Sequence, residues 1–443
     1  MRTEPEQSAP PATKAPTPRQ RVGMWRTLNR ISASISLPRG VNLRPGGGAL
    51  AVDDFRRFWY GSIISNVGSW MQMVAQGWLI LQLTDSAFYL GLVGLVRAVP
   101  ALTITLIGGV LADRLDRRRL LLFTQTTAGL LAIILGVLDI AGIVTVWQIL
   151  LLAFLSSIVM AVDNPTRQAL VPDLVGTENI ASAVGLNSAA WNAAAVIGPS
   201  LAGVLVATIS TSGAFFLNGL SYVAVVYAVW RIAPRPRQPR ARQSILDNLT
   251  DGLSFIFKDR RIWGLVVVLA VPTFLAGPYS QFMPIFAKDV LHKGPGGYGL
   301  LMGVTGIGSL VGALLVGKFG RSKRNGLALL ILTVIFAATL AVFAMSRWFV
   351  PALALLLVIG ATQTLFMAIG NTLLQLNVPE QMRGRVMSVY SLIPMGLMPL
   401  GSMILGSIGA VIGTPITVAS GAIIVLAFGL LSFRLFRAVR EMP

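Results

Sequence analysis

Amides, aromatic rings and methionines are the side chains best suited to bind a ligand, because they recur at helical spacing inside long apolar stretches. The first such stretch carries Asn66, Trp70, Gln72, Met73 and Gln76. A polar side chain inside lipid is costly, so it normally faces the interior of a helix bundle or a water-filled path. The pattern therefore predicts a helix face that lines a cavity within a membrane protein.

Three further stretches carry residues of the same kinds. One has Gln363, Met367, Asn371 and Gln375 at intervals of four, with Phe366 beside them. The other two contribute Asn187, Trp191 and Asn192, and Phe274, Tyr279 and Gln281. Amides, rings and thioethers adapt to bulky, partly apolar molecules, which predicts a cavity for a small-molecule substrate. For any single amide, the alternative is a hydrogen bond between two helices.

Arg97 is the only basic side chain well inside one of the long apolar stretches. An arginine at that depth needs a carboxylate, a carbonyl oxygen or water as its partner. Two roles follow: Arg97 holds an anionic substrate, or it pairs with Asp139 or Asp85. A third interpretation is that its side chain extends to the membrane surface.

The composition favours a membrane protein over a soluble enzyme. Of 443 residues, 54% are hydrophobic and 12% are charged, against roughly 25% charged residues in average soluble domains. There is no cysteine and a single histidine, His292, which excludes thiolate metal sites and argues against a histidine metal centre. No P-loop is present to use ATP. We therefore predict no enzyme, no catalytic residue, no cofactor and no metal.

Twelve stretches have the length and apolarity needed to cross a bilayer. They cover residues 56–82, 88–111, 120–142, 146–168, 179–206, 211–232, 261–287, 296–317, 325–345, 349–377, 384–411 and 414–436. Because lipid cannot bond to backbone amides, the spans must be helices. The sequence predicts an all-α integral membrane protein.

The basic residues orient these spans. The net charge of +19 gathers in the tails and in the connections after even-numbered spans, whereas the other side has only Lys288, Lys293 and Arg347. By the positive-inside rule, both termini are expected in the cytoplasm, and nucleic acid is not an expected partner. Residues 1–52 form a basic tail rich in Pro, Ser and Arg, which is either disordered or lies partly as a helix on anionic inner-leaflet lipids.

An internal repeat divides the chain into two halves. The run Arg56-Arg57-Phe58-Trp59 returns 204 residues later as Arg260-Arg261-Ile262-Trp263, and two further anchors match at nearly the same offset. The predicted units are the halves 53–232 and 259–437, the cytoplasmic linker 233–258 and the C-terminal end 438–443. Two parallel six-helix repeats with a site between them are typical of transporters.

Residues 109–118, Gly-Val-Leu-Ala-Asp-Arg-Leu-Asp-Arg-Arg, resemble the major facilitator signature G-x-x-x-D-[RK]-x-G-[RK]-[RK]. Asp116 replaces the usual glycine. In the fifth span, residues 185–203 resemble the antiporter motif through Gly185, Gly198, Pro199 and Gly203, with alanine at two glycine positions. Close helix packing is the alternative explanation for that motif. Three short runs, which begin at Asn66, Arg167 and Arg383, resemble the branch of siderophore exporters and macrolide-type efflux pumps.

The resemblance implies a major facilitator fold that exports drug-like or siderophore-like molecules from a bacterium across its plasma membrane by alternating access. It also implies a cytoplasmic charge cluster that stabilises the outward-facing state, formed by Gly109, Asp113, Arg114, Arg117, Arg118, Arg383 and Arg385. For the individual arginines, the alternative is that they only set topology. An importer or lipid flippase of the same fold, or a transport-inactive receptor, are the alternative functions.

Proton antiport is implied by the resemblance alone, since we expect no carboxylate in the middle of a span. The candidate coupling residues are Asp139, near the outer end of the third span, and Asp163, which we place at the cytoplasmic end of the fourth. Asp113 and Asp173 lie at cytoplasmic ends as well. Arg167 is also expected at a helix end, so it does not replace the arginine that many proton-coupled relatives carry inside the fourth span.

Overall fold

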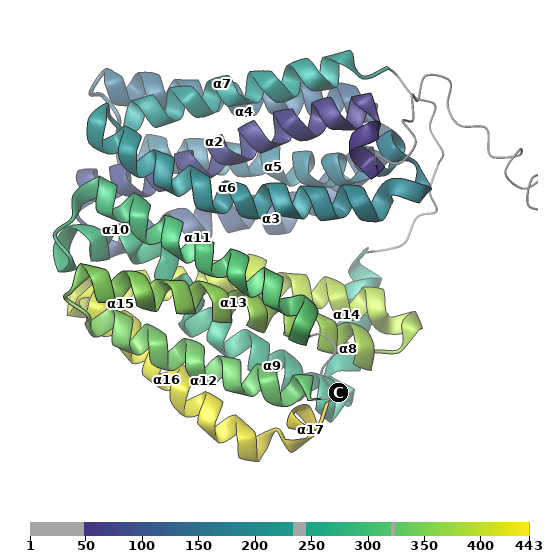
Figure 1. Cartoon of the computed structure of the whole chain (residues 1–443), viewed down its shortest axis with the longest axis vertical. Helices are drawn as coiled ribbons and strands as arrows, with labels where there is room; N and C mark the ends of the chain where they lie inside the picture. The colour runs from purple at the N-terminus through teal and green to yellow at the C-terminus, as the bar shows by residue number, and fades with distance from the viewer. Residues whose placement is uncertain (1–47, 234–244, 320–323, 443) are drawn as a thin grey trace, which may run out of the picture.

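The computed structural model describes residues 48–233, 245–319 and 324–442, and every regular element in these ranges is a helix. The helices form two groups that lie side by side, α2 to α7 in one and α8 to α17 in the other (Figure 1). Most of the predicted basic tail and part of the predicted linker lie outside the described residues. The predicted all-α architecture in two halves is confirmed.

The first half is built from six long helices, which follow a short 3-10 turn, η1 (Gly48–Ala51). They are α2 (Asp53–Thr84), α3 (Ala87–Arg114), α4 (Arg117–Ile140), α5 (Val146–Val175), α6 (Ile180–Thr208), preceded by η2 (Thr177–Asn179), and α7 (Thr211–Arg231). Side chains at several helix starts satisfy free backbone amides. Ser86 caps α3, and Thr145 forms a capping box with Gln148 at the start of α5.

The second half has the same number of crossings, but two of them are broken. Its elements are α8 (Ile245–Lys258), α9 (Arg260–Leu275), η3 (Gly277–Phe282), α10 (Met283–Ile285), η4 (Phe286–Val290), α11 (Gly294–Phe319), α12 (Asn325–Met345), α13 (Phe349–Asn377), α14 (Glu380–Leu392), η5 (Ile393–Leu397), α15 (Met398–Ile412), α16 (Thr414–Leu435) and α17 (Arg437–Arg440). Prolines cause local changes of helix type, because proline removes a backbone donor. Pro278 and Pro284 lie in the irregular part of the seventh crossing, and Pro394 lies in the π-helix η5.

Eleven helical segments of the described chain are long and apolar enough to cross a membrane. The 32-residue α2 supplies the twelfth crossing of the bundle. Its amides, among them Asn66, Gln72 and Gln76, make it less apolar than the other eleven. The chain is therefore a multi-pass membrane protein. Its most polar crossing, α2, carries the first of the predicted cavity-lining stripes.

The sequence misplaced one helix end that matters for the site. We expected the fourth crossing to stop at residue 168, but α5 continues to Val175 with Pro165 and Pro172 inside it. In a membrane bundle, neighbouring helices tolerate proline within a helix, so proline is a weaker stop signal there than in a soluble protein. Asp163 and Arg167 consequently lie inside a helix, not at its end.

The two halves touch closely at one end of the molecule only. Helix α6 packs on α11 and α3 packs on α15, through small residues that let backbones approach. A Cβ atom added to Gly203 would lie 2.7 Å from the Cα of Gly299. At the same end, Lys288 Nζ lies 2.6 Å from Asp85 Oδ1 and joins the halves by an ion pair.

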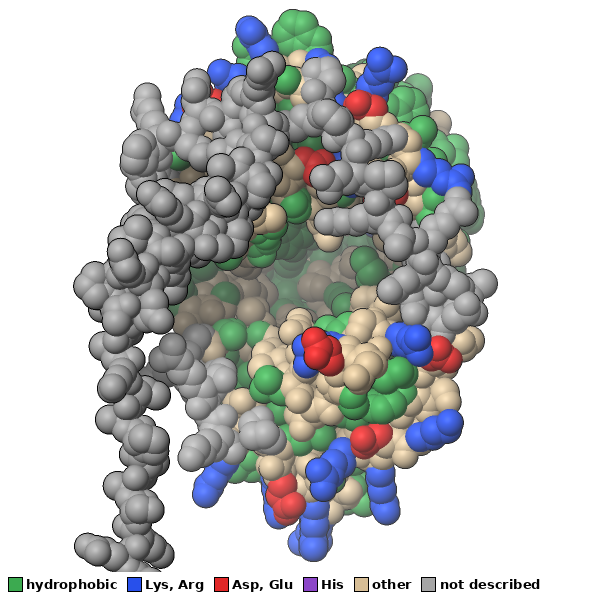
Figure 2. All heavy atoms as spheres, turned by 90° about the vertical axis from the view of Figure 1, so that its right-hand side faces the viewer, with side chains coloured by type: hydrophobic (Ala, Val, Ile, Leu, Met, Phe, Trp, Pro, Cys, Tyr) green, Lys and Arg blue, Asp and Glu red, His purple; other side chains and the backbone are tan. Residues whose placement is uncertain are grey.

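At the other end, the halves are separated. Figure 2 shows a hollow between them, on the face that also presents many Lys and Arg side chains. This basic end carries the connection between α3 and α4, the helix α8 and the start of α14 (Figure 1). The molecule is thus open at its basic end and closed at the opposite end.

The closed end yields a test of the packing. Replacing Gly299 by leucine must push α6 away from α11, and overpacking of this kind costs about 1–3 kcal/mol. We expect Gly299→Leu to lower the thermal unfolding temperature in detergent by several degrees. Gly296→Leu is the matched control on the same helix, because a Cβ there has only Ala207 nearby, at 3.9 Å. Equal unfolding temperatures for the two variants would contradict the close contact.

Candidate functional site

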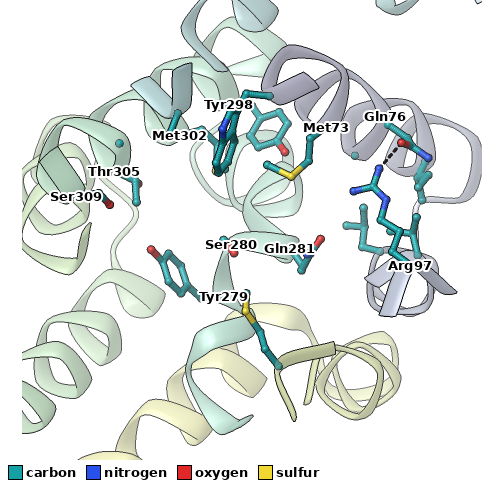
Figure 3. Close-up of a pocket in the computed structure, with 18 of the residues that line it drawn as sticks. Met73, Gln76, Arg97, Tyr279, Ser280, Gln281, Tyr298, Met302, Thr305 and Ser309 are labelled. Carbon is teal, nitrogen blue, oxygen red and sulfur yellow. Dashed lines mark hydrogen bonds between the residues drawn. The ribbon is translucent and has the colours of Figure 1, made fainter. Parts of the chain in front are cut away.

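A cavity of about 290 Å³ lies between the halves, and side chains from both halves line it. Seven predicted site residues belong to its wall: Trp70, Met73, Gln76, Arg97, Tyr279, Gln281 and Gln363. Figure 3 shows Met73, Gln76 and Arg97 facing Gln281 and Tyr298 across this space. Residue type, charge and spacing thus pointed to residues that the fold brings together from the first, second, seventh and tenth crossings.

Two further spaces adjoin the central cavity. The N-half recess measures about 310 Å³ and is lined by Ser69, Trp70, Gln72, Met73, Arg97, Ala128, Ala153, Ser156, Ser157, Met160, Trp191, Asn218 and Tyr222. It includes the predicted Gln72 and Trp191. A space of about 460 Å³ beside α13 is lined by Gln363, Thr364, Met367, Ala368, Asn371 and Tyr390. It includes the predicted Met367 and Asn371.

Six predicted cavity residues line none of these three spaces: Asn66, Asn187, Asn192, Phe274, Phe366 and Gln375. Phe366 is 4% exposed and packs in the core of the second half. The amide of Asn192 donates to the Ser188 carbonyl oxygen at 2.9 Å, and that of Gln375 donates to Asn371 Oδ1 at 2.7 Å. These two amides form hydrogen bonds within their own helices. Helical spacing alone therefore predicted more lining residues than these three spaces contain.

A further stripe, on α11, is not among the predicted cavity residues. Tyr298, Met302, Thr305 and Ser309 line the central cavity. Their spacing of four, three and four residues is the signal of one helix face, and it was available in the sequence. The hydroxyls of Thr305 and Ser309 give a weaker polar signal than amides. Ser and Thr are common in membrane helices, where their hydroxyls often donate hydrogen bonds to a carbonyl oxygen of the same helix. Indeed Thr305 Oγ1 donates to the Leu301 carbonyl oxygen at 2.8 Å.

Arg97 does not pair with either aspartate proposed for it. Its guanidinium donates a short hydrogen bond to Gln76 Oε1. Asp85 binds Lys288, and Asp139 Oδ2 accepts from Thr211 Oγ1 at 2.5 Å. Both aspartates lie at helix ends, Asp85 just after α2 and Asp139 at the last turn of α4, whereas Arg97 lies more than two turns inside α3. The predicted ion pairs fail because the groups lie at different depths.

Asp163 and Arg167 form a buried charge cluster within the first half. The Asp163 carboxylate is fully buried and accepts from Thr124 Oγ1 at 2.6 Å and Gln125 Nε2 at 2.7 Å. Arg167 Nε lies 2.5 Å from its second oxygen, and Nη1 of the same arginine donates to Ser62 Oγ at 3.1 Å. The expectation that Asp163 and Arg167 lie at the end of the fourth helix was therefore wrong, because α5 continues to Val175.

The signature loop ties three helices of the first half together. Arg117 lies 3.7 Å from Asp113 Oδ1 and 2.5 Å from Asp173 Oδ2, so it joins the end of α3 to α5. Arg118 donates to the carbonyl oxygens of Val229 and Trp230 at the end of α7. Asp116, which replaces the family glycine, accepts from the amide of Arg119 at 2.8 Å and caps α4. The substitution therefore has a local structural role.

Among the described residues, no ion pair joins Asp113 to the eleventh crossing, a contact that the resemblance implies for the outward-facing state. Arg385 Nη1 lies 2.7 Å from Asp251 Oδ2 of α8, and Arg383 is exposed. A Cβ added at Gly109 or Gly185 would meet nothing within 4 Å, so neither glycine marks a close contact between described helices. The close approach of α3 to α5 is at Gly108, beside the Ala161 carbonyl oxygen.

At the other positions of the antiporter motif, glycines lie in close helix contacts. A Cβ at Gly198 would lie 2.6 Å from the Cβ of Trp70, and Gly203 meets Gly299 of the second half. Pro199 lies inside α6, which stays helical from Ile180 to Thr208. The motif residues therefore allow α6 to contact both α2 and α11, which form part of the cavity wall.

Apolar crossings in two groups, with a cavity between them that side chains of both groups line, are the features of a membrane transporter of the major facilitator type. Residues 48–442 match the model of one family in this superfamily, described as transmembrane secretion effector. The chain belongs to this family, and transporters of this kind act on small molecules.

Curated relatives cover nearly the same region. The chain is 26% identical over 372 residues to the staphyloferrin A transporter of Staphylococcus aureus, which covers 80% of this chain and 89% of that protein. It is 27% identical over 376 residues to the enterobactin exporter EntS of Citrobacter koseri, which covers 85% of this chain and 89% of the exporter. The predicted likeness to siderophore exporters is confirmed.

Solved structures share the fold at low identity. A bacterial homologue of the human lysosomal transporter Spinster, in an inward-facing and unoccupied conformation, aligns with a TM-score of 0.68 at 14% identity over 88% of this chain and 98% of that chain. A bacterial homologue of the iron transporter ferroportin, also inward-facing, gives 0.66 at 17% identity over 88% and 98%. These likenesses establish the fold.

The charge cluster yields a stability prediction. Asp163→Asn leaves Arg167 without its carboxylate, and breaking a buried pair by removing one partner costs about 3–5 kcal/mol. The exposure of the Arg167 side chain, 17%, reduces this cost through solvent screening. We expect a clear drop in unfolding temperature for Asp163→Asn, and a smaller drop for the paired change Asp163→Leu with Arg167→Met. A paired change that is as damaging as the single one would contradict the buried-charge explanation.

Proposed function

We propose that this protein exports small amphipathic molecules, siderophore-like compounds among them, from the bacterial cytoplasm by alternating access. The observation that carries the proposal is the central cavity, whose wall combines residues of both halves. Such a wall must change its exposure when the halves rock against each other. The exporter names among the relatives support the direction and the class of substrate.

The orientation follows from the basic residues. Arg114, Arg117, Arg118 and Arg119 lie at the open end of the bundle, as do Arg383 and Arg385, whereas Lys288 and Lys293 lie at the closed end. Because positive loops stay in the cytoplasm, we propose that the open end and both termini face the cytoplasm and that the protein lies in the bacterial plasma membrane. The conformation is then inward-open and admits substrate from the cytoplasm.

Export requires the closed end to open. The contact of Gly203 with Gly299 must separate, and the ion pair between Lys288 and Asp85 must break. Both partners of that ion pair are partly exposed, at 38% and 71%, and exposed pairs contribute only about 0–1 kcal/mol. The closed end is therefore held mainly by helix packing and opens without the loss of a strong charge interaction.

Closure of the cytoplasmic end is the proposed role of the signature loop. Asp113 is 57% exposed and reaches Arg117 only at 3.7 Å, so its carboxylate is available to the basic start of α14. A negative charge near the N-terminus of a helix is favourable, and α14 begins at Glu380. Movement of Asp113 toward Arg383 and Arg385 would stabilise the outward-facing state.

Proton antiport is the proposed energy source. Of the two candidate coupling residues, the buried Asp163 has the stronger support, because neutralising its carboxylate would release Arg167 inside the bundle. Asp139, at the end of α4, accepts a hydrogen bond from Thr211. Partner exchange by a buried carboxylate couples proton binding to helix movement.

The direction of transport is tested in everted membrane vesicles, whose outer surface is the cytoplasmic face. We expect a fluorescent amphipathic substrate to accumulate inside the vesicles when a proton gradient is imposed, and a protonophore to abolish the accumulation. Vesicles that contain the cavity-blocking variant Gly77→Trp provide the control. Depletion of substrate from the vesicles would indicate an importer, and an unchanged distribution for a broad compound panel would indicate a receptor.

The gate is tested with Asp113→Asn. We expect efflux to fall several-fold, because the outward-facing state loses a stabilising charge. Asn371→Cys, in the space at the open end, should be labelled faster in everted vesicles, because the inward-facing state becomes more populated. The chain has no native cysteine, so the label reports on this position alone. Glu178→Gln removes a charge from an exposed site at the same end and is the control. Wild-type efflux with unchanged labelling would rule out the gate.

A further inference from the structure

We infer that the substrate site has two lobes joined at Arg97 and selects elongated anions over cations. This inference rests on the proposed function and adds the chemical class of the ligand. The central cavity forms one lobe, and the N-half recess between α2, α4, α5 and α7 forms the other. Three side chains line both lobes: Trp70, Met73 and Arg97.

The charges of the wall carry the selectivity. Arg97 is the only charged residue among those that line the central cavity, the recess and the space beside α13, and none of these is an Asp or Glu. Within the described residues, no carboxylate oxygen lies within 4.0 Å of the Arg97 nitrogens. A charge in a low-dielectric site that lacks an opposite charge attracts a ligand that brings one. A cationic ligand would find no carboxylate in these walls and would be repelled by Arg97.

The surroundings of Arg97 hold it at the junction. Gln76 is 2% exposed, and its Oε1 accepts from the guanidinium. Ser157 Oγ donates to the Arg97 carbonyl oxygen at 2.5 Å, which ties α5 to the same turn of α3. A partly exposed guanidinium fixed in this way keeps further donors for planar oxygen groups such as carboxylates.

Two more donors near Arg97 have no hydrogen-bond partner among the described residues. Gln76 Nε2 and Trp70 Nε1 are buried without a hydrogen bond, and a buried donor without an acceptor is unfavourable. The acceptor oxygen of Gln76 is already used by Arg97, so only its amide donor remains. A ligand with several acceptor oxygens would satisfy these donors after small side-chain rotations.

Both lobes combine polar and apolar side chains. Ser69, Ser156, Asn218 and Tyr222 give the recess hydroxyl and amide groups. The central cavity offers Gln281, Ser309 and Gln363 together with the apolar Ile80, Leu90 and Met302. The fitting ligand therefore has an anionic oxygen group at Arg97 and a partly apolar body whose polar groups reach into both lobes.

Binding of three matched probes to the protein in lipid nanodiscs tests the charge selectivity. The probes are 1-naphthoate, 1-naphthylmethanol and 1-naphthylmethylammonium, measured by isothermal titration. We expect naphthoate to bind at least tenfold more tightly than the other two. Arg97→Gln should abolish this preference, and Arg97→Lys should retain part of it. Equal affinities for the three probes, or a preference that survives in Arg97→Gln, would overturn the inference.

The recess is tested with Ser156→Phe, which fills that lobe and leaves the residues of the central cavity in place. We expect N-(1-naphthoyl)serine, which adds a polar arm to the ring, to lose at least tenfold in affinity, while naphthoate changes less than threefold. An equal effect on both probes would overturn the two-lobed arrangement.

The unfolding temperature of each variant shows whether it is folded, and Arg97→Lys carries the test if Arg97→Gln does not fold. Anion preference in a wild-type protein that moves no compound across vesicles would refute the proposed export and leave the binding inference intact. Export without any anion preference would refute the binding inference and leave the proposed export intact.

Discussion

A polar group inside lipid must find its partner within the protein, and this constraint organises the whole molecule. It requires the backbone to be helical wherever it crosses the bilayer. It also explains the position of α2, the most polar crossing. Its neighbours are five helical elements of its own half, and its amide stripe faces them and the cavity. Asn218 donates to Gln72 at 2.5 Å, and Gln76 receives Arg97, so the same amides that shape the cavity also join helices.

The constraint separates two arginines that look alike in the sequence. Arg167 is neutralised by Asp163 in a cluster with Thr124 and Gln125, and it contributes to the integrity of the first half. Arg97 donates to the neutral amide oxygen of Gln76 and lines the central cavity. One charge is balanced by the fold, and the other is the one that we propose to bind an anionic ligand. This difference connects stability in the first case with specificity in the second.

Small residues provide the mobility that a transporter needs. Helix contacts at Gly203 with Gly299, and at Gly91 with Ser402, close one end by backbone packing. Such contacts form over short distances and are lost together when the helices separate, because dispersion falls off steeply with distance. The exposed pair of Lys288 and Asp85 adds little to them. Two packed arrangements of the same halves can therefore be close in free energy, as alternating access requires.

The sequence by itself determined the class of fold, the two repeats, most crossings and seven wall residues of the central cavity, because lipid imposes length, apolarity and a helical period on every span. The tenth crossing was even predicted with the bounds of α13, Phe349–Asn377. Only the tertiary structure decided which faces meet: it turned Phe366 into the core, brought the stripe of Tyr298 and Met302 to the cavity, and placed Asp163 beside Arg167. Spacing along one helix defines a face, but the depth and rotation of that face depend on packing against helices far away in the chain.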